Sequence, residues 1–153
     1  MPLSTGKIMV SGPTAGGFEA RISTEIRREM WEKWILLAAL GGVTCLMRGA
    51  IGEVEAAAGG AEFARQFLDE VVAVVRAAGV PPSEGFVASV RERITAKGSP
   101  LTSSMYRDLR DGRRVEYEQI IGDLCRLGHK AQINTPRLAA AYAHLDVYAR
   151  RIA

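Results

Sequence analysis

Apolar residues recur at helical spacing through nearly all of the chain after residue 22. The longest apolar run covers 34–47. Ser23 or Thr24 can cap a helix ahead of this run, and Glu25 in the first turn complements the helix dipole. The pattern therefore predicts a long first helix that starts at Ser23 or Thr24 and continues through the apolar run.

The same periodicity, interrupted by Gly and Pro, predicts the remaining helices. Gly79 and Pro81-Pro82 end one of them, and Ser83 can cap the next. Thr135-Pro136 is a start signal, since it places a capping hydroxyl before a proline at the first helical position. The expected ranges are 61–78, 84–96, 103–111, 114–127 and a last helix that begins at Thr135-Pro136.

Two glycines interrupt the middle of the first helix. Gly41 and Gly42 each cost a helix about 1 kcal/mol relative to alanine. Glycines that a helix retains at such a cost indicate the close approach of another helix or of a ligand.

The N-terminal region has a different character. Residues 1–17 are rich in Gly, Pro, Ser and Thr, and Lys7–Val10 and Phe18–Ile22 are short enough and apolar enough to form strands. We therefore expect an extended or strand segment over residues 1–22 and a helical domain over residues 23–153. The fold class is mostly all-α, a bundle of six or so helices.

Composition and charge narrow the function. Of the 153 residues, 48% are apolar and 24% are charged, which is typical of a folded globular protein. The net charge is +3, and the basic pairs Arg27-Arg28, Arg113-Arg114 and Arg150-Arg151 each have carboxylates close by. A nucleic-acid-binding protein usually gathers its cations on one face. A phosphate-bearing small molecule is as good a match as a polynucleotide, so nucleic-acid binding is the weakest hypothesis.

The cysteines and the apolar run bear on the compartment. Cys45 and Cys125 have no metal-ligand spacing and do not predict a disulfide framework. No signal-peptide pattern precedes the helices, and the run 34–47 is shorter than the roughly 20 residues that span a bilayer. We expect this run to be a buried core helix of a cytoplasmic protein that has no membrane partner.

Lys33 is the first residue that can carry chemistry. It lies between Trp31 and Trp34, on a helical face that it shares with Ile26, Met30 and Leu37. An ammonium held against apolar surface gives up its proton more readily and can serve as a proton donor. The alternative is an ion pair with Glu29, four residues earlier.

Ser103-Ser104 and Glu116 lie at the two ends of a second candidate segment. Hydroxyls at a helix start usually cap it, which takes one serine and leaves the other free for an anion such as a substrate carboxylate. Glu116 can bind a ligand or pair with Arg113 or Arg114. The sequence contains no G-x-G-x-x-G turn after a strand, no Walker motif and no metal-ligand cluster, and His129 and His144 are isolated.

Residues 26–33 read I-R-R-E-M-W-E-K, and residues 103–116 read S-S-M-Y-R-D-L-R-D-G-R-R-V-E. These segments resemble the C-terminal helical domain of ketopantoate reductases (2-dehydropantoate 2-reductases). The segments 41–44, 51–53, 135–136 and 141–145 are also similar to that family, so the resemblance covers roughly residues 22–151. It implies a helical bundle like the 6-phosphogluconate-dehydrogenase-like C-terminal domain.

The resemblance implies a role for each candidate residue. Lys33 matches the general acid of ketone reduction, Ser104 a substrate contact, and Glu116 a residue that holds both substrate and cofactor. The activity it implies is NADPH-dependent reduction of 2-dehydropantoate, or of a related 2-keto acid, in pantothenate biosynthesis. Where the family often has asparagines this chain has Leu37 and Gly41, and where the family has Ile-Asp it has Tyr117-Glu118.

Family members also carry a Rossmann domain that binds NADPH. In this chain residues 1–22 correspond at most to its last strands, so we expect the chain to be inactive without a Rossmann-domain partner and to bind no cofactor tightly alone. We also expect the chain to form a homodimer. The alternative function is a non-catalytic α-helical dimerisation module, since the apolar helix and Gly41-Gly42 suit close helix packing.

Overall fold

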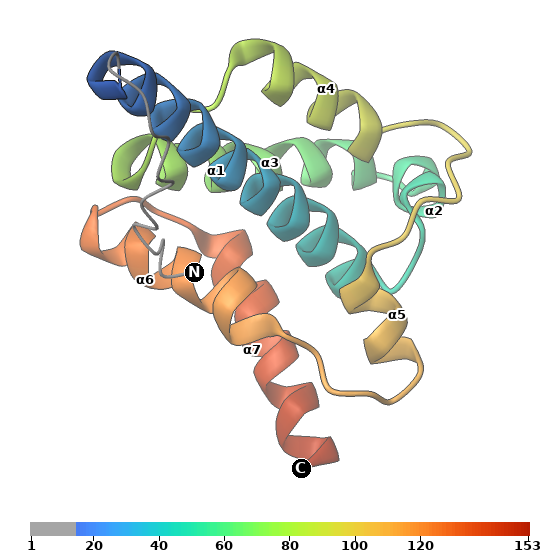
Figure 1. Ribbon diagram of the computed structural model, residues 1–153. Coiled ribbons are helices and arrows are strands. Elements are labelled where there is room, and N and C mark those ends of the chain that lie inside the picture. The colour runs from blue at the N-terminus through green and yellow to red at the C-terminus, as the bar shows by residue number, and fades with distance from the viewer. Residues whose placement is uncertain (1–14) are drawn as a thin grey trace.

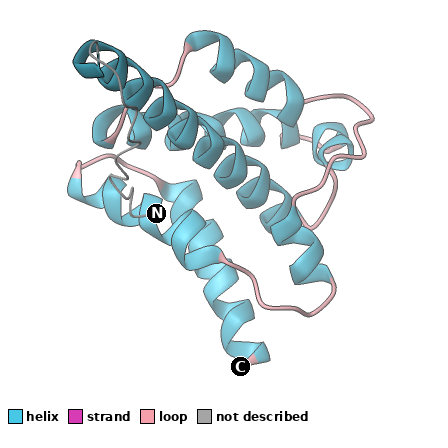
Figure 2. Cartoon of the chain, viewed as in Figure 1, coloured by secondary structure: helices cyan, strands magenta, loops and turns pink. Residues whose placement is uncertain are grey.

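The structure is a computed structural model that describes residues 15–153, with side chains from Thr24 onward. The described part contains seven α-helices, one π-helical turn and no strand (Figure 2). In chain order these are α1 (Ala15–Met47), α2 (Ile51–Ala56), α3 (Gly60–Ala78), α4 (Glu84–Ile94), α5 (Ser104–Arg110), the π-turn η1 (Glu118–Gly122), α6 (Asp123–Lys130) and α7 (Pro136–Ile152). The predicted all-α class is confirmed.

The start of the first helix was predicted wrongly. α1 begins at Ala15 rather than at Ser23 or Thr24, so Phe18–Ile22 is helical and not a strand. Glu19, Ala20 and Arg21 all favour helix, and a helix already nucleated further along the chain extends through such residues at little cost. The other strand candidate, Lys7–Val10, lies outside the described residues.

The prediction of one helix over 114–127 was also wrong. Residues 113–116 are not helical, and η1 and α6 together carry the helical structure from Glu118 to Lys130. Gly128 does not end α6, which continues to Lys130. This glycine instead allows close packing, since an added Cβ would lie 3.1 Å from Val74 and 3.3 Å from Thr135. The short helix α2 was missed, since six residues are too few to show a helical period.

α1 crosses the molecule in front of α3, and most of the other elements pack against its C-terminal half (Figure 1). It contacts α2, α3, α4, α5, α7 and η1. By length and composition Thr24–Met47 could cross a membrane, but 56% of that apolar window is buried inside the bundle. The side chains of Trp34, Ile35 and Val43 are almost completely buried. The apolar run is thus the core helix that its length predicted.

The glycine pair of α1 marks two close approaches between helices. A Cβ at Gly42 would overlap the ring of Phe67 on α3, and a Cβ at Gly41 would overlap the sulfur of Met105 on α5. Both glycines are buried. The expectation that another helix approaches α1 at these positions is confirmed.

A carboxylate from a distant helix caps α7. Thr135 occupies the position before Pro136, as predicted, but its hydroxyl makes no capping hydrogen bond. Instead, the buried carboxylate of Glu70 on α3 accepts hydrogen bonds from the backbone N–H groups of Arg137 and Leu138, at 3.0–3.1 Å, and pairs with the Arg137 guanidinium at 3.1 Å. This charge stabilises the positive end of the helix dipole and fixes α7 against α3.

The two environments of helical glycine predict opposite effects of adding one methyl group. Gly42→Ala should lower the free energy of unfolding by about 1–2 kcal/mol, because overpacking against Phe67 costs about 1–3 kcal/mol and outweighs the gain in helix propensity. Gly85→Ala on α4, where nothing lies within 4 Å of the added Cβ, should raise it by about 0.5–1 kcal/mol. Urea unfolding of both variants measures the difference. Equal effects of the same sign would show that the packing at Gly42 is not tight.

Candidate functional site

Lys33 lies on α1 with its side chain exposed, beside two buried tryptophans. The rings of Trp31 and Trp34 stack with their centroids 5.1 Å apart. Among the described residues Lys33 makes no ion pair, so the predicted alternative of a pair with Glu29 is not found. The ammonium therefore has no internal partner.

Ser103 and Ser104 divide their roles as expected. The Ser103 hydroxyl caps α5 by accepting the backbone N–H of Tyr106 at 2.9 Å, and it lies 2.7 Å from the hydroxyl of Thr44 on α1. Thr44 in turn donates to the carbonyl of Leu40 at 2.6 Å. Since each hydroxyl has one proton, Ser103 donates to Thr44, and the chain of bonds is complete.

Ser104 is the spare serine. It opens α5 with an exposed side chain, and its hydroxyl makes no hydrogen bond to the described residues. The hydrogen bond between Ser103 and Thr44 therefore fixes the backbone position from which the Ser104 hydroxyl projects.

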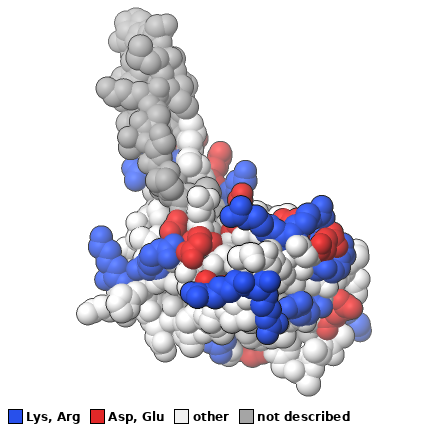
Figure 3. Space-filling view, turned by 90° about the horizontal axis from the view of Figure 1, so that it is seen from below, with Lys and Arg blue, Asp and Glu red and all other residues white. Residues whose placement is uncertain are grey.

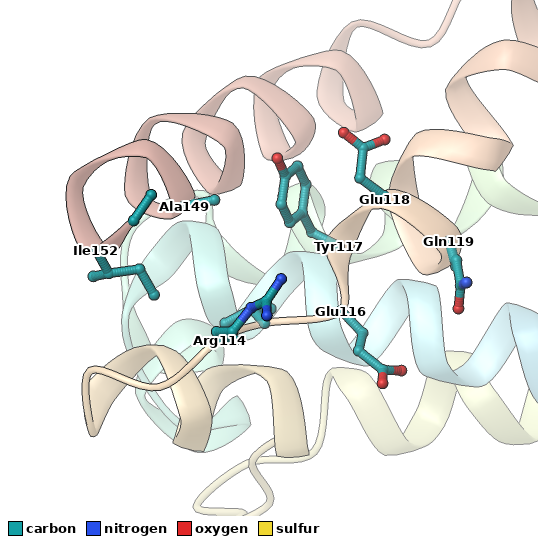
Figure 4. A pocket seen from close by; sticks show the side chains of 9 residues that line it. Arg114, Glu116, Tyr117, Glu118, Gln119, Ala149 and Ile152 are labelled. Carbon is teal, nitrogen blue, oxygen red and sulfur yellow. The ribbon is translucent and has the colours of Figure 1, made fainter.

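Glu116 is exposed on the segment 113–117 that connects α5 to η1. The predicted alternative of an ion pair with Arg113 is not found, because Arg113 pairs with Asp111 at 2.6 Å and with Asp108 at 3.5 Å. Within the described part of the chain Glu116 has no ion-pair partner. Figure 4 shows its carboxylate pointing away from α7, whereas the next two side chains point toward that helix.

These next two side chains anchor the segment to α7. The Tyr117 hydroxyl donates to Asp146 at 2.8 Å, and the Tyr142 hydroxyl donates to Glu118 at 2.8 Å. The bond to the Asp146 carboxylate raises the pKa of Tyr117 to about 12, and the same bond, with help from Arg150, lowers the pKa of Asp146. Sequence reasoning missed this network, because its partners lie 24–29 residues apart with no local pattern.

An open hollow of about 900 Å³ adjoins Glu116. Arg114, Tyr117 and Gln119 line it from one side, and Ala149 and Ile152 at the end of α7 line it from the other (Figure 4). Lys33 and Ser104 are not in its lining. No hydrogen bond or ion pair joins Lys33, Ser104 and Glu116, so the described structure does not gather the three into one closed pocket.

α1 nevertheless links the parts of the chain that carry these residues. It carries Lys33 itself, and it contacts both α5, which carries Ser104, and η1, which follows Glu116. Thr44 follows Lys33 by eleven residues, which is three turns, so the two lie on the same stripe of α1, separated by about 16 Å along the axis. At the Thr44 end Ser103 binds, and next to Lys33 the indole of Trp34 donates to the carbonyl of Ile120 in η1 at 2.9 Å. The segment that carries Glu116 joins these two contact points.

Between the ends of this stripe the surface is apolar. Leu37 and Leu40 are partly buried, and Gly41 lies against Met105. The places where the similar family often has asparagines thus hold a leucine side chain and a helix contact. The middle of this stripe therefore offers no polar side chain, and its polar groups lie at its two ends.

The cysteines and the surface charge bear on two other functions, thiol catalysis and nucleic-acid binding. Both cysteines are free, and burial raises the pKa of the Cys45 thiol to about 12, so this thiol is not an activated nucleophile. On the face shown in Figure 3, basic and acidic side chains are interspersed. This face therefore does not show the purely cationic surface that nucleic-acid binding favours.

Comparison with known proteins gives a consistent result. The family model described as ketopantoate reductase PanE/ApbA C terminal matches residues 25–149. The chain is 28% identical over 130 residues to the uncharacterized oxidoreductase YkpB of Bacillus subtilis (strain 168), covering 85% of this chain and 43% of that protein. It is 28% identical over 123 residues to a 2-dehydropantoate 2-reductase of Halobacterium salinarum, covering 80% and 40%.

Solved structures show the same fold. The dimeric ketopantoate reductase of Staphylococcus aureus superposes with a TM-score of 0.74 at 23% identity, covering 84% of this chain and 45% of that one. The 2-dehydropantoate 2-reductase of Methylococcus capsulatus gives 0.70 at 26% identity, covering 84% and 41%. The chain thus spans less than half the length of these relatives.

The adjacent serines should respond differently to the loss of a hydroxyl. Ser103→Ala should lower the free energy of unfolding by about 1–2 kcal/mol, because it removes the cap of α5 and the donor to Thr44. Ser104→Ala is the matched control, and should change stability by less than about 0.5 kcal/mol. Chemical denaturation of the two variants checks this, and a large loss in Ser104→Ala would contradict the assignment of Ser103 as the cap.

Proposed function

Because the chain belongs to the ketopantoate reductase family, whose C-terminal domain it matches over residues 25–149, we propose that it forms the substrate-side domain of a reductase. The reaction is the reduction of 2-dehydropantoate or a related 2-keto acid to the 2-hydroxy acid. One observation carries the proposal: Lys33, Ser104 and Glu116 are exposed and have no internal partners among the described residues. Lys33 lies on α1, Ser104 on α5, and Glu116 just ahead of η1, and both α5 and η1 contact α1. Side chains that bind a substrate need this freedom.

Each residue has a distinct role in the proposal. Lys33 donates its Nζ proton to the ketone oxygen as the keto carbon is reduced. The Ser104 hydroxyl hydrogen-bonds the substrate, and Glu116 holds the substrate and the adjoining part of the cofactor. In the complete enzyme, NADPH supplies the hydride.

The described residues do not by themselves fit a dinucleotide. Residues 15–153 contain no strand followed by a glycine-rich turn and a helix, which is the arrangement that binds a pyrophosphate. We therefore propose that a Rossmann domain provides this binding, with residues 23–153 as the substrate domain. Residues 1–22, which include the first turns of α1, would lead to the nucleotide-binding side. The open site supports this division, since one domain forms only one wall of a cleft between two.

We also propose that the chain forms a homodimer in the cytoplasm. The Staphylococcus aureus relative is a dimeric enzyme. On α7 of this chain the apolar side chains of Val147 and Ile152 are 50% and 39% exposed, and a second copy packed against α7 would bury them. A non-catalytic dimerisation module remains the alternative, and the two differ in whether Lys33 matters to turnover.

The proposed acid predicts a large effect on turnover. In an enzyme assembled from this chain and a nucleotide-binding domain, Lys33→Met should lower kcat for 2-dehydropantoate about 10²- to 10⁴-fold, because it removes the proton donor. Lys97→Met, at another exposed lysine, is the control and should leave kcat unchanged. NADPH oxidation measures both. Normal turnover in Lys33→Met, or turnover by the 153-residue chain alone, would contradict the proposal.

The proposed dimer predicts an effect of charge on α7. Sedimentation should show a dimer for the chain, and Val147→Glu should shift it toward monomer, because the charge would be buried at the interface. Met47→Glu places the same charge on an apolar residue that is 45% exposed at the end of α1, and should leave the dimer intact. A wild-type chain that sediments only as a monomer would exclude this interface.

A further inference from the structure

Two stacked tryptophans flank Lys33 in the sequence, and only one of them makes a hydrogen bond through its indole N–H. Trp31 and Trp34 are both nearly buried, at 5% and 3% exposure. The indole N–H of Trp31 is buried with no hydrogen-bond partner in the described structure, whereas that of Trp34 donates to the carbonyl of Ile120. The Trp34 bond spans 86 positions of the chain, so it is a tertiary contact rather than a local one.

The acceptor lies in an irregular turn. In η1 the backbone N–H of Asp123 bonds the carbonyl of Glu118, five residues earlier, instead of the usual four. Such a turn departs from the regular ladder of backbone bonds. The Trp34 indole supplies the donor for Ile120.

The turn is held from the opposite side as well. Tyr117 donates to Asp146, and Glu118 accepts from Tyr142, and both partners belong to α7. The segment just after Glu116 is therefore fixed between α1 and α7, while the Glu116 side chain itself is free. On α1 the residue that makes the contact immediately follows Lys33.

We propose that Trp34 is a positioning residue, whose hydrogen bond to the Ile120 carbonyl sets the place of Glu116 relative to Lys33. This inference rests on the proposed function for the roles of Lys33 and Glu116, but the placement itself is a property of this chain. The residue acts through the π-turn and does not touch substrate.

Paramagnetic relaxation in the 153-residue chain tests the placement without any turnover. A nitroxide is attached at Lys33→Cys in a background of Cys45→Ala and Cys125→Ala, and the amide signals of residues 116–120 are read in ¹⁵N-labelled protein. Trp34→Phe should change the relaxation profile of these amides, because the turn loses its bond to α1. Trp31→Phe is the matched control, with a similar loss of buried ring area and no lost bond, and should leave the profile unchanged.

The same pair of variants is then compared in the enzyme assembled with a nucleotide-binding domain. With 2-dehydropantoate and NADPH, Trp34→Phe should lower kcat about 10- to 100-fold more than Trp31→Phe, since small misplacement of reacting groups is costly. Relaxation profiles that respond equally to both substitutions overturn the inference, as does an equal fall in kcat. If the wild-type assembly shows no turnover, the proposed function fails, and the relaxation comparison alone still decides whether Trp34 positions Glu116.

Discussion

The burial of α1 is the constraint on which the rest of the structure depends. One helix packs against α2, α3, α4, α5, α7 and η1, so each of these elements is placed by its contact with α1. Two of these contacts require the absence of a side chain, at Gly41 and Gly42. The contact with α5 also includes the hydroxyl of Thr44, which hydrogen-bonds the capping residue Ser103. The cost of two glycines in a helix is accepted because closer packing of α3 and α5 offsets it.

Adjacent residues of α1 lie on opposite sides of the boundary between core and surface. Since successive positions on a helix are rotated by about 100°, Trp34 can be buried while Lys33 beside it is exposed. The exposed position is thereby attached to one of the most deeply buried parts of the molecule. Stability and the candidate site are coupled in this way: a change that loosens the contacts of Trp34 or Thr44 also moves the backbone near Lys33 or Ser104.

Local pattern accounts for much of the fold, and distant partners account for what it missed. Helical periodicity and caps such as Ser83 and Ser103 predicted α3, α4 and α5 to within about two residues at each end, and the Thr135-Pro136 signal predicted the start of α7. The capping of α7 by Glu70 could not be predicted, because the carboxylate comes from another helix. The π-turn depends on Trp34, Tyr142 and Asp146, which are remote in sequence. The residue pattern singled out the three candidates and the family resemblance gave them roles, but only the structure shows that Lys33, Ser104 and Glu116 all lack internal partners among the described residues.

The apolar middle of the α1 stripe limits how this domain can recognise a substrate. Under the proposed function the ligand lies between the ammonium of Lys33 and the hydroxyl of Ser104, which are placed near opposite ends of the stripe. The positions between them hold Leu37, Leu40 and Gly41, and none of these side chains can form a hydrogen bond. An apolar substituent on the substrate is therefore compatible with this wall, whereas a hydroxyl directed at it would lose its bonds to water without replacement. The altered positions thus affect the choice among 2-keto acids more directly than they affect the reduction itself, because the proton donor and the anchoring groups lie outside the apolar stretch.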